Sequence, residues 1–180
     1  MERLFNMRER IEETKGLFDL MEHIKLEDIV MIEIGCFQGE STSIFAQHDQ
    51  VKKIYCIDPW VSGYDRIDRA AKCDMKEVEA AFDERMKPFE EKITKLKMKS
   101  SDAITYFLDN NIKVDLVYID GNHGKSAVIA DINNYKQIIK EGMFISGHDW
   151  QHEPVRLAVE QTLGKIDETF RDNSWIKRIG

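Results

Sequence analysis

The chain has few cysteines and no long apolar run, and both features limit the classes of protein to which it can belong. Its three cysteines (Cys36, Cys56 and Cys73) are an odd number without a Cys-x-x-Cys pair, which argues against a disulfide framework and a structural zinc site. No apolar stretch approaches the roughly 18–20 residues that a membrane span needs. The charged N-terminus lacks the apolar centre of a secretory signal. The sequence therefore predicts a cytoplasmic protein with no membrane partner.

Acidic residues outnumber basic ones, 33 to 26. The net charge of −7 opposes non-specific binding to phosphate backbones, so no nucleic-acid partner is expected. The lysines of residues 92–99 alternate with apolar residues, which is more typical of a solvated strand edge. No repeat, low-complexity tract or Pro/Gly/Ser linker divides the 180 residues, of which 42% are hydrophobic. We therefore expect one domain, residues 1–180, with a core of its own. The oligomeric state is left open, a homodimer included.

Short apolar runs alternate with segments of helical periodicity along the chain. The expected helices are an N-terminal helical segment within 1–28 and helices at 41–48, 75–89, 101–108, 128–139 and 155–163. The expected strands are 29–35, 52–58, 93–100, 114–121, 143–149, 167–171 and 174–179. Strands that alternate with helices indicate an α/β fold with a parallel sheet, right-handed crossovers and helices on both faces. The last two strands flank a two-residue turn and must be antiparallel.

Local signals predict where several of these helices begin and end. Gly16 is expected to interrupt or split the first helix. Asp74 forms a capping-box pattern with the glutamate three residues later. Ser100 or Ser101 is expected to cap the helix that ends near residue 108, and Gly142 to end the helix that follows the fourth strand.

The stretch MIEIGCFQGEST (residues 31–42) combines an acid with two glycines at the end of the first strand. Ligands of doubly wound sheets bind beyond the carboxyl ends of the strands. Gly35 is expected to let a ligand lie against the backbone, and Gly39 to allow close packing at the next helix. The spacing is not the dinucleotide pattern Gly-x-Gly-x-x-Gly. Glu33 would repel a diphosphate but suits a sulfonium cation, which favours S-adenosylmethionine over NAD.

Acids after the second and third strands extend this interpretation. Asp58 follows Gly35 by 23 residues, close to the spacing of about 20 at which an acid holds a ribose hydroxyl pair. Alone it would be a strand-end turn residue before Pro59, but beside Glu33 and the glycines the ribose role is favoured. Ser101 and Asp102 lie where an adenine amino group would be met. Either residue can equally be a plain helix cap.

A second group of polar residues follows the fourth and fifth strands. Asp120 and Asp149 each end a predicted central strand, so they are expected at one rim together with His148. Two carboxylates and an imidazole suit Mg²⁺ or Mn²⁺, the imidazole moving the preference toward Mn²⁺, Fe²⁺ or Zn²⁺. Such an ion would lower the pKa of a substrate hydroxyl and orient it. His123 is a candidate general base. Each residue taken singly is also compatible with a turn.

Four motifs together resemble the class I S-adenosylmethionine-dependent methyltransferases. They are EIGCFQGEST, IDPW, LVYIDGNHGKSAVIADI and GHDW, and the similarity extends over nearly the whole chain from about Val30. The resemblance is strongest to a small bacterial and phage group of metal-assisted O-methyltransferases, related to antibiotic- and sugar-modifying enzymes. The resemblance implies a Rossmann-like three-layer αβα sandwich, with a seven-stranded sheet in the order 3-2-1-4-5-7-6 and the last strand antiparallel.

The resemblance also implies a set of site residues. The glycine motif would surround the methionine end of the cofactor, and its metal-using members hold the ion at the positions of Asp120, His148 and Asp149. Many members have two acids or Asp-Asn where this chain has His-Asp. The cofactor-binding residues are expected to be Glu33, Gly35, Cys36, Phe37, Gly39, Asp58, Pro59, Trp60, Ser101, Asp102 and Asp120. The catalytic residues are expected to be His123, Asp120 and His148.

The expected reaction is in-line attack of a substrate hydroxyl oxygen, on a small molecule or sugar, on the sulfonium methyl group. Residues 61–73 are a candidate substrate lid or an ordinary helix-entry loop. Candidate substrate contacts are Tyr64, Arg66, Arg69, Trp150, His152 and Arg156. Cys36 and Cys56 are expected in the core rather than as nucleophiles. The alternatives are a metal-independent N- or protein methyltransferase, a non-catalytic cofactor-binding protein and, less favoured, an NAD-dependent oxidoreductase.

Overall fold

The computed structural model describes the backbone of residues 7–65 and 72–180 and the side chains from residue 15 onward within these ranges. The helices are α1 (Met7–Ile24), α2 (Glu40–Gln47), α3 (Met75–Met86), α4 (Ser100–Asp109), α5 (Lys125–Tyr135) and α6 (Glu153–Leu163), with 3₁₀ turns at Lys87–Phe89 and Lys136–Ile138. The strands are β1 (Ile29–Ile34), β2 (Val51–Ile57), β3 (Ile93–Leu96), β4 (Val114–Ile119), β5 (Ile139–Gly147), β6 (Glu168–Thr169) and β7 (Trp175–Arg178).

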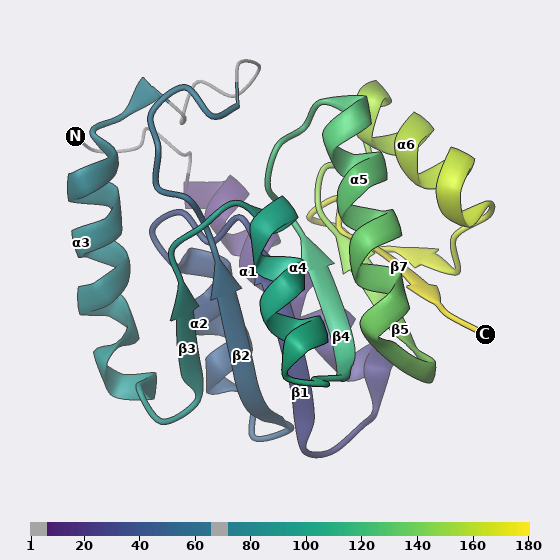
Figure 1. Ribbon diagram of the computed structural model, residues 1–180, viewed down its shortest axis with the longest axis horizontal. Coiled ribbons are helices and arrows are strands. Elements are labelled where there is room, and N and C mark those ends of the chain that lie inside the picture. Colours follow the sequence, from purple (N-terminus) through teal and green to yellow (C-terminus); the bar gives the residue numbers. More distant parts are fainter. Residues whose placement is uncertain (1–6, 66–71) are drawn as a thin grey trace.

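The strands form one sheet in the order β3-β2-β1-β4-β5-β7-β6. Neighbours from β3 to β5 pair in parallel, and β7 runs antiparallel to both β5 and β6. The predicted α/β fold, strand order and antiparallel last strand are thereby confirmed. In Figure 1 the arrowheads of β2, β3 and β4 point to the same upper edge of the sheet, where the loops that carry the candidate site residues begin.

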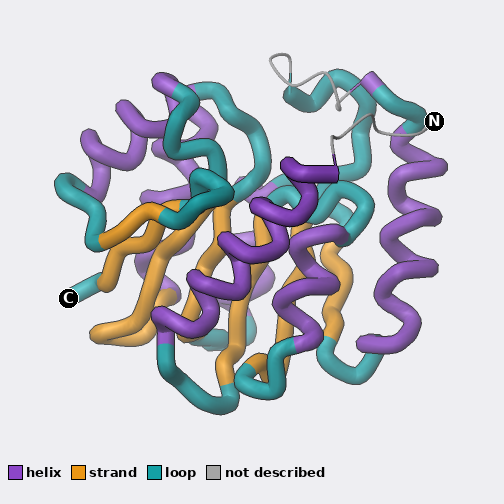
Figure 2. The backbone as a smooth tube through the Cα atoms, turned by 180° about the vertical axis from the view of Figure 1, so that it is seen from behind, coloured by secondary structure: helices purple, strands orange, loops and turns teal. Residues whose placement is uncertain are grey.

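Alternate side chains of each strand enter opposite layers of the core. On one face, Met31 and Cys56 pack with residues of α1, α2 and α3. On the other face, Ile32 and Val117 pack with residues of α4, α5 and α6. Figure 2 shows α1 and α2 crossing the back of the sheet, whereas α4 and α5 lie in front of it in Figure 1. The strands are apolar on both sides because helices cover both faces.

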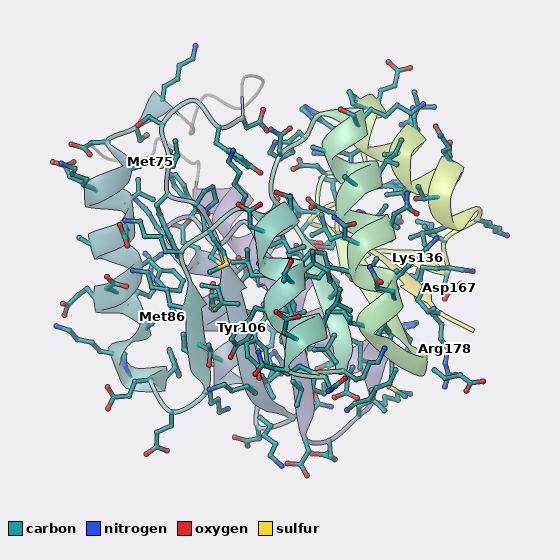
Figure 3. All side chains as sticks on the ribbon, in the orientation of Figure 1. Met75, Met86, Tyr106, Lys136, Asp167 and Arg178 are labelled. Carbon is teal, nitrogen blue, oxygen red and sulfur yellow. The ribbon has the colours of Figure 1, made fainter. Side chains whose placement is uncertain are left out.

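The helix boundaries test the local signals of the sequence. Asp74 caps α3 as predicted, accepting a hydrogen bond from the Lys76 backbone N–H at 3.0 Å; Figure 3 labels the two ends of this helix. Neither Ser100 nor Ser101 caps α4, because the helix already includes both and its cap is Lys99 without a side-chain bond. Among the described residues, no helix is both long enough and apolar enough to cross a membrane.

Two glycine predictions are wrong. Gly16 lies inside a continuous α1, buried where a β-carbon would come within 2.2 Å of the Asp172 side chain, so the glycine allows a close contact rather than a break. Gly142 does not end α5, which is over by Tyr135, but lies within β5 with φ +75°. Its carbonyl accepts a hydrogen bond at 2.7 Å from the Nε of Arg178, the residue labelled at the end of β7 in Figure 3.

Candidate active site

The β1–α2 loop begins where β1 and β4 end side by side. Gly35 has φ +89°, and a β-carbon there would lie 2.1 Å from the backbone oxygen of Asp120. The Gly35 N–H donates to Ile57 O at 2.8 Å, and the Asp120 N–H donates to Ile34 O at 2.8 Å. The missing side chain therefore makes room for the protein's own backbone, which the sequence did not indicate. Asp120 is held next to the loop by the same contact.

Glu33 is fully buried beneath this loop. Its carboxylate accepts hydrogen bonds from the hydroxyls of Ser41 and Thr42 in the first turns of α2. Burial raises the pKa of Glu33 to about 7, against the opposing effect of the two hydroxyls. Gly39, with φ +77°, precedes α2 and leaves room for the Phe82 ring of α3, as the close-packing expectation required. Glu33 thus anchors the helix that follows the loop.

Asp58 joins the β1–α2 loop to the segment after β2. One carboxylate oxygen accepts from the Phe37 N–H at 2.9 Å, and the other accepts from the Trp60 N–H at 2.7 Å. The Trp60 indole N–H donates back to the Phe37 carbonyl at 2.9 Å. Phe37 and Trp60 both adopt positive φ, at 47° and 45°. Burial raises the pKa of Asp58, and the two backbone N–H groups counteract that rise. This arrangement is called the Asp58 clamp below.

The start of α4 lies beyond the clamp. Ser101 and Asp102 are exposed there, and the Ser101 hydroxyl donates to the Asp102 carboxylate at 3.1 Å. Two neighbours that the sequence analysis missed, Ser100 and Asp131, are buried. Burial raises the pKa of Asp131 to about 6, although a hydrogen bond with Ser100 acts in the opposite direction. Asp131 falls on the apolar stripe of α5, three residues after Val128, so an acid at a core-facing position was the available signal.

Three residues of the second group meet at the rim. Donor atoms of Asp120, His123 and Asp149 lie within 4.8 Å of one another. His123 Nε2 is 2.7 Å from an Asp149 carboxylate oxygen and 3.9 Å from one of Asp120. The Nδ1 of His148 is 3.4 Å from Asp149 and 3.9 Å from Asp120. All four side chains are thus brought together from the ends of β4 and β5, and His123 lies nearer to Asp149 than His148 does, while both imidazoles are 3.9 Å from Asp120.

The two imidazoles carry strongly shifted pKa values. Burial by itself lowers the pKa of His123, but the Asp149 hydrogen bond and the charges of both aspartates raise it to about 10. The same balance raises the pKa of His148 to about 10. Burial opposes ionisation of Asp149, yet the two histidines hold its pKa below the usual range. These shifts favour the protonated form of both imidazoles and the ionised form of Asp149.

One loop residue outside the predicted set also reaches the rim. Asp65 is buried, and one of its carboxylate oxygens lies 2.8 Å from the His123 backbone N and 2.6 Å from His123 Nδ1. The Asn122 side-chain N–H donates to the Tyr64 carbonyl at 2.9 Å. No sequence signal marked Asp65, since residues 61–65 have no periodicity. Arg66, Arg69 and part of the expected 61–73 lid lie outside the described residues.

The segment after β5 borders the same rim. The Trp150 backbone N–H donates to Asn173 O at 3.0 Å, and the His152 ring centroid lies 5.8 Å from that of His123. The Trp175 indole donates to the His148 carbonyl at 3.1 Å. A small pocket behind the rim is lined by Ile119, Asp120, Gly121, Asn122, His123, Val128, His148, Asp149, Val155 and Trp175.

Cys36 and Cys56 are buried as expected, and burial raises both thiol pKa values.

Comparison with known proteins places this geometry in a family. A family model described as a methyltransferase domain (Methyltransf_24) matches residues 32–150, a span that contains every residue predicted to bind the cofactor, to bind a metal or to act in catalysis. The match covers more than half of the chain, which therefore belongs to this methyltransferase family. The chain is also 28% identical over 153 residues to the uncharacterized protein R132 of Acanthamoeba polyphaga mimivirus. The alignment covers 83% of this chain but only 64% of that protein, less than two thirds of its length.

Solved structures agree in fold. CalS11, a TDP-rhamnose 3′-O-methyltransferase of calicheamicin biosynthesis, is similar with a TM-score of 0.69 and 13% identity, over 96% of this chain and 81% of that one. The O-methyltransferase NovP gives 0.62 and 12%, over 97% and 80%. A putative rRNA-methylase of Clostridium thermocellum gives 0.61 and 12%, over 93% and 98%. These neighbours have different acceptors, so the similarity carries the fold and leaves the acceptor open.

Proposed function

We propose that the protein transfers the methyl group of S-adenosylmethionine to a hydroxyl oxygen of a small molecule or sugar, with a divalent ion at the rim. One observation carries the proposal. The Asp58 clamp and the Asp120–His123–Asp149 group occupy the same edge of one methyltransferase sheet. The first supplies a shaped loop for a nucleoside, and the second supplies oxygen and nitrogen ligands beside it. The O-methyltransferase neighbours CalS11 and NovP support a hydroxyl acceptor.

The clamp leaves Asp58 able to bind a ribose. Its carboxylate accepts the backbone N–H groups of Phe37 and Trp60 and a further backbone hydrogen bond from Cys36, and an ionised carboxylate offers about four lone-pair sites in all. One ribose hydroxyl would therefore still find an acceptor. Glu33, bound to Ser41 and Thr42, would act from below the loop rather than by contact, and its pKa of about 7 leaves only part of its charge at neutral pH. The remaining cofactor residues, from Gly35 to Asp102, stay predictions.

The rim residues fit a divalent ion. Asp120, His123 and Asp149 would hold it. The resemblance assigned His148 to the ion in place of His123, and His148 would lie beside these three ligands. Such an ion would supply a Lewis acid that lowers the pKa of the substrate hydroxyl. The two carboxylates would orient that hydroxyl, and its proton would pass to the imidazole of His148, whose own proton the ion would displace. The oxygen–methyl bond would form as the sulfonium–methyl bond breaks, with S-adenosylhomocysteine as the neutral thioether product. The general-base role predicted for His123 would require an Nε2 that is free both of the ion and of the proton that its raised pKa retains.

Calorimetric titration with S-adenosylhomocysteine tests the proposal, first alone and then with Mn²⁺ or Mg²⁺. Micromolar binding is expected, much weakened in Asp58→Asn and unchanged in Asp109→Asn, a matched change at an exposed residue at the end of α4. Turnover on a panel of hydroxyl and amine acceptors, with and without a chelator, then tests the metal and the acceptor atom. No binding of S-adenosylhomocysteine would refute the proposal. Turnover of amines that survives chelation would favour metal-independent N-methyl transfer.

A further inference from the structure

Asp65 makes two contacts with a single residue of the rim. The same carboxylate oxygen lies 2.8 Å from the backbone N of His123 and 2.6 Å from its ring Nδ1. Asp65 is only 6% exposed, so a carboxyl group shielded from water faces the His123 ring. Buried carboxylates are costly unless paired, which makes an incidental contact a poor explanation.

The two contacts fix how the His123 ring lies. A backbone donor and a ring donor from one residue converge on one oxygen, which restricts rotation of the side chain. Because Nδ1 faces Asp65, the other ring nitrogen points away from it and lies 2.7 Å from Asp149 and 3.9 Å from Asp120. A histidine that binds a metal through one nitrogen commonly donates the other N–H to a carboxylate, which sets the ring orientation.

We propose that Asp65 is a positioning residue that aims Nε2 of His123 at the Asp120–Asp149 pair and so completes the divalent-ion site. The proposal rests on the metal assistance proposed above. It makes His123 a ligand held by a loop residue, a different role from the general base that the sequence suggested.

The position of Asp65 also links the site to the segment that follows β2. Residues 64 and 65 contact the β4–α5 loop twice, through Asp65 with His123 and through Tyr64 O with the Asn122 side chain. These contacts place residues 64 and 65 directly against the loop that carries His123.

The test compares Asp65→Ala and Asp65→Asn with Asn122→Ala, which removes the other contact between the two loops. Mn²⁺ affinity is measured by titration in the absence of substrate, and S-adenosylhomocysteine affinity is measured in parallel. We expect Asp65→Ala to bind Mn²⁺ about 10–100-fold more weakly, with Asp65→Asn in between. S-adenosylhomocysteine should bind all three variants as it binds the wild type, which shows that the fold is intact.

A spectroscopic readout separates positioning from a merely structural role. In ¹⁵N-labelled, metal-free protein, the His123 Nδ1–H proton should be shifted downfield and protected from exchange, and Asp65→Ala should lose this signal. Unchanged Mn²⁺ affinity in Asp65→Ala, or an equal loss in Asn122→Ala, would overturn the proposal. If the wild type binds S-adenosylhomocysteine but no Mn²⁺, the metal assistance fails and the ion-site role of Asp65 with it. The Nδ1–H signal alone then decides whether Asp65 positions His123.

Discussion

Removing the Asp58 side chain should weaken the fold as well as cofactor binding. Its two oxygens accept the backbone N–H groups of Phe37 and Trp60. Asp58→Ala leaves both amides without these acceptors, and a buried amide without a partner costs about 1–3 kcal/mol. Because Asp58 is half-buried, water reaches the amides in part and the lower half of that range applies to each. We therefore expect the free energy of unfolding to fall by about 2–4 kcal/mol.

Asp58→Asn separates the two effects. The amide keeps one acceptor oxygen, so about half of that loss is expected, while the charge that would hold a ribose is gone. Urea unfolding measures the stability of both variants. Fluorescence is a suitable probe because the Trp60 indole is bonded to the Phe37 carbonyl inside the clamp. A wild-type urea midpoint for Asp58→Ala would refute the clamp as the element that holds the two loops together.

Two further predictions concern buried positions. Gly16→Ala should lower the free energy of unfolding by about 1–3 kcal/mol, because the added β-carbon would overlap the Asp172 side chain. The same change in an exposed helix would stabilise the helix. A urea midpoint higher than that of the wild type would contradict this prediction. The pKa of Glu33 is raised from 4.5 to about 7 in the folded protein, so between these pH values Glu33 keeps a proton that the unfolded chain releases. The free energy of unfolding should therefore fall by about 3 kcal/mol as the pH rises from 4.5 to 7. Glu33→Gln should remove that decline, measured by urea unfolding at pH 4.5 and pH 7.

The strands and their parallel pairing could be predicted from local sequence patterns, whereas the strand order came from the family resemblance. Continuous apolar runs such as that of β1 mark strands covered on both faces, and their alternation with helices requires parallel pairing. The glycines could not be interpreted in this way. Gly16 is explained by Asp172, more than 150 residues away, and Gly142 by its pairing with the chain end, where Arg178 bonds its carbonyl. A glycine signals a need for space or for an unusual φ, but the neighbour that creates the need is tertiary.

The residues of the candidate site differ in the same way in how well the sequence predicts them. Asp120 and Asp149 follow central strands, so parallel topology alone brings them to one rim, and the structure places them around His123. Asp65 lies in a segment without periodicity, and only the folded chain shows that it faces His123. Asp131 could have been noticed, since an acid on the apolar stripe of α5 contradicts the pattern around it. Sequence patterns identify residues positioned by regular elements and miss those positioned by loops.

The glycine motif itself changes meaning once its contacts are known. Glu33 bonds α2, Gly35 admits the backbone of Asp120, and Asp58 holds Phe37 and Trp60. Each residue that the pattern assigned to a ligand thus has a structural task in the protein alone. The motif therefore builds a loop of fixed shape first, and selectivity for a ligand follows from that shape. Since Asp120 also belongs to the rim group, a change that shifts this loop should disturb the proposed cofactor site and the proposed ion site together.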